Sequence, residues 1–149
     1  MIIRSLKQSE LEWCRKCAEQ FFVDSKLPGR LDFHYWVGYW QNLIHLKIGE
    51  VFALVNDCEV LGMLGGVKTR CSMTGDLEAY EMFWYVMPEY RGVAGVKILK
   101  HFENWALQSE CKRVKMVHLE SINPKEMKDL YLRMGYETLE HAYTKELKQ

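Results

Sequence analysis

The pattern of apolar and polar positions divides the chain into amphipathic helices and short strands. Apolar residues recur with helical spacing in segments 9–23, 32–46, 95–106 and 123–134. Strand-like runs occupy residues 1–6, 50–55, 59–67, 79–86, 113–119, 136–139 and 142–147. The pattern predicts an α/β (α+β) fold in the order βααβββαβαββ, with helices flanking a mixed central sheet of about seven strands.

Residues 79–106 form the centre of this arrangement. Their strand half is apolar or aromatic on both faces, as expected for a strand inside a sheet that helices cover. Strict alternation places one set of side chains on each face: Tyr80, Met82, Trp84 and Val86 on the first, and Ala79, Phe83 and Tyr85 on the second. Pro88 cannot continue the hydrogen-bond ladder, so the strand is predicted to end near Met87.

The turn after this strand is a candidate phosphate site. A helix that begins just past a buried strand directs free backbone N–H groups, and the positive end of its dipole, into one small space. Gly92 and Gly95 would let the backbone approach a ligand, and Arg91 would add a positive charge. Many such turns carry glycine for turn geometry only, so this feature alone leaves both interpretations open.

Composition narrows the class of protein. The 149 residues, 48% of them apolar, fit a single domain spanning 1–149. Twenty basic and twenty acidic residues leave no net charge, which argues against nucleic-acid binding. Membrane spans need runs of roughly 18 apolar residues, and none occurs. Five scattered cysteines suggest no disulfide framework, and Cys14 and Cys17 fall in a predicted helix without further ligands, so we expect no metal and a cytoplasmic location.

Two separated motifs carry a family resemblance. The run from Trp84 to Gly92, with the glycine-containing helix start after it and Trp105-Ala106 later, resembles motif A of the GNAT family of acetyl-CoA-dependent N-acyltransferases. The segment Asn123…Leu130-Tyr131-Leu132-Arg133-Met134-Gly135-Tyr136 is similar to the family's last helix. The predicted element order is that of the GNAT fold, and the shape of the turn also resembles GNAT-like proteins of bacteriophages.

The loop departs from the family pattern, which is Arg or Gln, two residues, Gly, one residue, then Gly or Ala. Counted from Arg91, the small-residue positions are Ala94 and Val96; counted back from the helix, the last glycine is Gly95 and the loop is one residue short. We prefer the second register because it keeps the apolar helix face intact. The departure motivates an alternative function, a catalytically weak or inactive GNAT-fold protein that acts as a protein-interaction module.

The resemblance implies direct acetyl transfer from acetyl-CoA to a primary amine of a small molecule or protein. An amine with a pKa near 10.4 is only about one part in two thousand neutral at pH 7, so the reaction needs a base. Glu81, Glu120 and His118 compete for this role, with the two glutamates almost equal and His118 ranked below them, because a histidine on a strand is more often a half-buried structural residue. Tyr131 matches the residue that protonates the departing thiolate, although a core tyrosine would also suit its apolar helix face.

The resemblance also implies the binding residues. Val86 and Met87 would offer backbone groups to the pantetheine arm, with Asn123 nearby. The diphosphate would bind the loop residues Arg91, Gly92, Val93, Ala94, Gly95 and Val96. The acceptor side would be built from the 24–30 loop and the final strand pair. We also keep a homodimer as an assembly to be tested.

Overall fold

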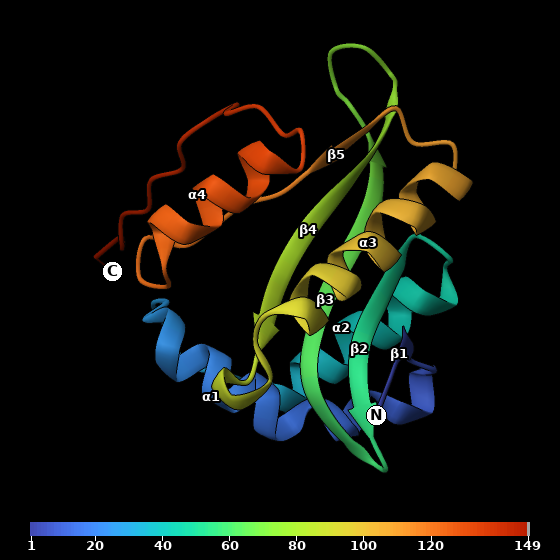
Figure 1. Ribbon diagram of the computed structural model, residues 1–149, viewed down its shortest axis with the longest axis vertical. Coiled ribbons are helices and arrows are strands. Elements are labelled where there is room, and N and C mark those ends of the chain that lie inside the picture. Colours follow the sequence, from blue (N-terminus) through green and yellow to red (C-terminus); the bar gives the residue numbers. More distant parts are fainter. Residues whose placement is uncertain (149) are drawn as a thin grey trace.

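A single five-stranded sheet organises the computed structural model, which describes residues 1–148 (Figure 1). The strands lie in chain order and are β1 Ile2–Ser5, β2 Gly49–Asn56, β3 Glu59–Arg70, β4 Leu77–Val86 and β5 Arg113–Lys115. Neighbouring strands are antiparallel except β4 and β5, which are parallel. The helices are the 3₁₀ turns η1 Gln8–Cys14 and η2 Pro88–Tyr90, and the α-helices α1 Arg15–Ser25, α2 Phe33–His45, α3 Val93–Gln108 and α4 Pro124–Arg133.

Helices cover both faces of the sheet. In Figure 1, α3 crosses in front of the strands and α2 lies behind them. Phe33 and Trp40 of α2 belong to the apolar cluster on one face, and Ile98 and Phe102 of α3 belong to the cluster on the other. The predicted α/β class is therefore confirmed, with one sheet between two apolar layers.

Two glycines of β3 allow this close packing. A Cβ atom on Gly65 would lie 2.3 Å from the Phe83 ring, and one on Gly66 would lie 2.3 Å from the Phe102 ring. Any larger residue would push an aromatic ring off its side of the sheet.

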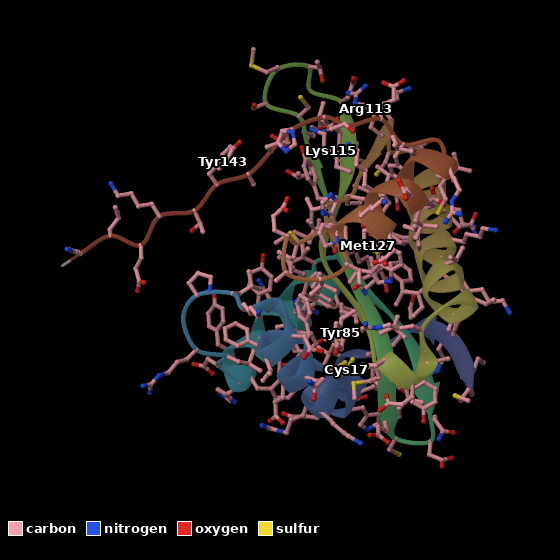
Figure 2. All side chains as sticks on the ribbon, turned by 60° about the vertical axis from the view of Figure 1, so that its left-hand side comes forward. Cys17, Tyr85, Arg113, Lys115, Met127 and Tyr143 are labelled. Atoms are coloured by element: carbon pink, nitrogen blue, oxygen red, sulfur yellow. The ribbon has the colours of Figure 1, made fainter. Side chains whose placement is uncertain are left out.

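The prediction of about seven strands is wrong for the described residues, because neither 136–139 nor 142–147 forms a strand. A strand needs a partner for its backbone hydrogen bonds, and this segment pairs with none of the five strands. Tyr143 is 93% exposed, and Figure 2 shows it on a segment that leads away from the sheet. The alternation of apolar and polar residues in 136–147 is compatible with a strand, but the segment forms no strand pairing in this structure.

The predicted strand 113–119 is also shorter than expected. β5 ends at Lys115, which pairs with Tyr80, and the chain beyond it leaves β4.

Within residues 1–148, no helix is both long and apolar enough to cross a membrane.

Candidate active site

The two faces of β4 differ from those that strict alternation predicts. Trp84 and Val86 pack in the cluster with α3, as expected together, but Ala79 packs there with them. Phe83 and Tyr85 belong to the cluster with α1 and α2. The predicted pairing of Ala79 with Phe83 and Tyr85 on one face is therefore wrong.

A β-bulge in the middle of β4 causes this difference. Glu81 lies opposite Gly66 and Phe83 lies opposite Gly65, so Met82 has no partner on β3. An extra residue in one strand shifts the alternation of every side chain on one side of it. Bulges often re-aim side chains beside active sites, and here the bulge directly follows Glu81.

A cluster of charges holds β4 and β5 together at one end. Glu78 is 1% exposed; its carboxylate accepts a 2.6 Å hydrogen bond from Arg113 Nε and lies 3.4 Å from Lys115 Nζ. Arg113 holds the pKa of that carboxyl below its usual range. Figure 2 shows Arg113 and Lys115 near the upper end of these strands. Pairing ends at Lys115, so the two chain segments separate beyond this cluster.

A cavity of about 520 Å³ lies between β4 and the segment after β5, where the two separate. This volume is typical of small-molecule sites. Its walls come from β4, the turn and first residues of α3, the segment after β5, and α4; they include Glu81, Phe83, Trp84, Tyr85, Val86, Arg91, Gly92, Gly95, Val96, Val117, His118, Leu119, Asn123, Met127 and Tyr131.

Glu81 is the buried carboxylate of this cavity. It is 8% exposed, and its Oε2 atom has no hydrogen-bond partner among the described residues. Burial raises the pKa of the Glu81 carboxyl to about 8, and the backbone of Val117 offsets part of this effect. A carboxyl with a pKa near neutrality can exchange protons with a substrate at physiological pH.

Two further buried polar atoms lack partners within residues 1–148, Trp84 Nε1 and His118 Nδ1. Both residues line the same cavity as Glu81. Buried polar groups are normally hydrogen-bonded, so three unpaired ones around one cavity indicate a site built for a polar ligand. The sequence did not indicate Trp84 as a binding residue, because a tryptophan on a central strand is typical of the apolar core.

Tyr131 of α4 also faces the cavity. Its hydroxyl donates a 2.8 Å hydrogen bond to the Val117 carbonyl, and its ring lies 6.1 Å from the Trp84 ring. Burial, followed by the nearby charge of Glu81, raises the pKa of the Tyr131 hydroxyl. The helix ends at Arg133, and Gly135 forms the predicted glycine stop two residues later, with a φ of 91° and its N–H donated to the Leu132 carbonyl.

The predicted helix start near Gly95 is two residues late, because α3 begins at Val93 with Gly92 as its N-cap. Gly92 has φ 110° and ψ −124°, a conformation that other residues avoid. Its carbonyl accepts from the amides of Gly95 and Val96. The N–H groups of Gly92, Val93 and Ala94 have no acceptor in the described chain, so they are available to an anion.

Gly95 is part of the cavity wall. A Cβ there would lie 3.6 Å from the Trp84 ring and 3.7 Å from a Val86 methyl group, which is ordinary contact. Arg91 lies beside them, donating a 2.9 Å hydrogen bond from Nε to the Val86 carbonyl. Its guanidinium carbon is 5.3 Å from the centre of the Tyr85 ring.

Of the other predicted site residues, Glu120 and Met87 lie outside the cavity and Asn123 lines it. Glu120 is exposed and does not line the cavity. Both backbone groups of Met87 are already paired, its N–H with the Leu61 carbonyl and its carbonyl with the Tyr90 N–H. Asn123 does line the cavity, with φ 41° at the start of α4. The 1–148 range contains no group of His, Cys, Asp or Glu side chains arranged to hold a metal ion.

Solved structures share this fold at low sequence identity. A predicted acetyltransferase with acetyl-CoA from Clostridium acetobutylicum has a TM-score of 0.76 and 12% identity, covering 97% of this chain and 95% of that one. For a ribosomal-protein-alanine N-acetyltransferase from Brucella melitensis biovar Abortus 2308 the values are 0.71 and 12%, with 99% and 100% coverage. For an aminoglycoside 6'-N-acetyltransferase from Acinetobacter haemolyticus they are 0.71 and 15%, with 100% and 99% coverage.

A search of curated protein sequences finds no match to this chain. The model of the acetyltransferase (GNAT) family, in contrast, matches residues 8–136. This match covers most of the chain, and the fold of the neighbours agrees with it. The protein therefore belongs to the GNAT family and is an N-acetyltransferase.

Proposed function

We propose that this protein transfers an acetyl group from acetyl-CoA directly to a primary amine, without a covalent enzyme intermediate. One observation carries the proposal: an open cavity between β4 and the segment after β5 contains the Glu81 carboxyl, whose Oε2 atom has no partner among the described residues, and reaches the α3 turn. The free amides of that turn suit the diphosphate of the donor. Because both apolar clusters pack on one sheet, we also propose that residues 1–149 act as a single domain.

The donor would lie along the α3 and α4 side of the gap. The amides of Gly92, Val93 and Ala94 would hold the diphosphate. At Gly95 and Val96 the donor would pass close to the protein backbone. The N–H of Met87 points to β3, so that of Val86 points to the open side, because neighbouring strand residues alternate. We therefore assign the pantetheine contact to Val86 and Asn123.

Arg91 would supply a positive charge at the same turn. In the described structure its guanidinium is bound to the Val86 carbonyl. The donor would compete for that carbonyl, and Arg91 would move the short distance to the diphosphate, where a bidentate contact is stronger.

We assign the base to Glu81, because Glu120 is exposed outside the cavity. The ionised Glu81 carboxylate takes a proton from the substrate ammonium. The freed nitrogen lone pair attacks the thioester carbonyl carbon, forming the C–N bond, and the C–S bond then breaks with its electron pair on sulfur. The Tyr131 hydroxyl exchanges its hydrogen bond to the Val117 carbonyl for one to that thiolate, gives the thiolate its proton, and is reprotonated by the second proton that the nitrogen loses. One proton per turnover leaves through Glu81.

The test is thiol release from acetyl-CoA in the presence of a panel of primary amines, with mass spectrometry of the acetylated product. Glu81→Gln should lower turnover by about 10²–10⁴-fold, the usual contribution of a general base. Glu120→Gln is the matched control and should retain wild-type turnover. Equal effects of the two substitutions would contradict the assignment. Absence of both donor binding and product would favour the protein-interaction module.

A further inference from the structure

Residues from both faces of the sheet line the cavity, so its two ends have different walls. Trp84, Val86 and Tyr131 belong to the apolar cluster on the α3 side. Phe83 and Tyr85 belong to the cluster on the α1 and α2 side, yet they line the same cavity. If the donor occupies the α3 side, the second end is the one from which an acceptor enters.

This second end is aromatic and apolar. Phe21 of α1 lies 5.3 Å from the Tyr85 ring, measured between ring centres. Leu27 and Ile122 complete the wall with Phe83. The hydroxyl of Tyr85 donates a hydrogen bond to the Asp24 carboxylate, so its proton is not available to a ligand.

The charges around the cavity disfavour a polycation. Glu81 and Glu126 are the acidic residues among those that line it, and Arg91, Arg133 and His118 are the basic ones. The Glu81 carboxyl has its pKa raised to about 8 by burial, so much of it is neutral at pH 7. Asp24 is next to the second end, but Tyr85 and Gln20 already bond to its carboxylate. Several ammonium groups would therefore find few anionic partners in this cavity.

We propose that the acceptor is a monoamine carrying an aromatic or branched apolar group, which packs against Phe21, Phe83 and Tyr85 while its single amine reaches Glu81. Aminoglycosides and polyamines are excluded as preferred acceptors. This inference rests on the proposed acetyl-CoA-dependent transfer.

The test compares kcat/KM for 2-phenylethylamine, isoamylamine, spermine and kanamycin with saturating acetyl-CoA, and separately measures acetyl-CoA binding by calorimetry without acceptor. The aromatic and branched amines should exceed spermine and kanamycin by about 100-fold or more, the scale of discrimination when buried groups find or lack partners. Phe21→Ala should lower kcat/KM for 2-phenylethylamine by about 10-fold, the value of a few lost apolar contacts. It should leave acetyl-CoA binding unchanged.

Phe22→Ala is the matched control, since Phe22 is the next residue of α1 and does not line the cavity. It should keep the wild-type preference. Faster transfer to spermine or kanamycin, together with normal acetyl-CoA binding, would overturn the acceptor class and leave the proposed function standing. Absence of acetyl-CoA binding would overturn both.

Discussion

The Tyr131 hydroxyl donates to the carbonyl of Val117, so the phenol of α4 is fixed to the segment that forms the wall opposite β4. The same hydroxyl is close enough to Glu81 for that carboxylate to influence its pKa. Acid and base groups of the proposed reaction therefore share one buried space. This arrangement suits a transfer in which one proton is removed from the amine and another is given to sulfur.

Replacing Tyr131 by Phe tests the acid role. Turnover should fall by about 10²–10⁴-fold, while acetyl-CoA affinity stays within a few-fold of wild type. The Val117 carbonyl loses its donor, which should also cost about 1 kcal/mol of stability. Thiol-release kinetics and calorimetry separate the two effects. Unchanged turnover would remove Tyr131 from the acid role.

A pair of glycine substitutions tests the conformation of the α3 turn. Gly92→Ala forces a Cβ into a backbone conformation at φ 110°, and should cost about 1–3 kcal/mol of unfolding free energy or of acetyl-CoA binding. Gly95→Ala places its methyl group in ordinary contact with Trp84 and Val86, so its unfolding free energy should stay close to that of the wild type. Urea denaturation and calorimetry measure both. A tolerated Gly92→Ala would show that the turn is not held in this conformation.

The stability of the protein should depend on the ionisation of Glu81. Its carboxyl has a usual pKa of 4.5 and a pKa of about 8 in the folded protein. Between these values the folded protein keeps a proton that the unfolded chain releases, so unfolding free energy falls as pH rises. Glu81→Gln removes this loss, and its stability relative to wild type should rise by up to about 1.4 kcal/mol per pH unit. Urea denaturation at pH 5 and pH 8 measures the difference; a constant difference would contradict the burial of this carboxyl.

The same ionisation should control catalysis. Because Glu81 must be ionised to accept a proton, kcat/KM should increase with pH and level off above an apparent pKa of about 8. Measuring kcat/KM for several amines across a range of pH checks this. The residual kcat/KM of Glu81→Gln should not show this pH dependence. Its persistence in that variant would assign the profile to another group.

Local patterns predicted the family correctly, and they named Tyr131 and Glu81, which the structure places in one cavity. The helix stop at Gly135 follows from backbone chemistry that any sequence shares, and the position of Tyr131 followed from the family motif around it. The bulge at Met82 could not be located from β4 alone, because it depends on pairing with Gly65 and Gly66. The alternation on β4 was therefore predicted with the wrong face for Ala79.

Long-range pairing explains the other differences. The pattern of residues 113–119 is typical of one strand, but pairing stops at Lys115, and residues 117–119 line the cavity instead. Trp84 Nε1 became a candidate ligand donor only when the structure showed that it lacks a partner among the described residues. Glu81 and Glu120 were equal candidates in sequence, and their burial separates them.

Calorimetric titration with acetyl-CoA and with S-acetylpantetheine, which lacks the diphosphate, tests the central claim most directly. The free amides of the α3 turn predict one site for acetyl-CoA, with S-acetylpantetheine binding at least about 10-fold more weakly, because it makes no charge-assisted hydrogen bonds there. Gly95→Glu should remove most of this advantage by adding a carboxylate beside the diphosphate. Equal affinities for the two donors, or no heat with millimolar acetyl-CoA, would contradict a diphosphate site at the amino end of α3.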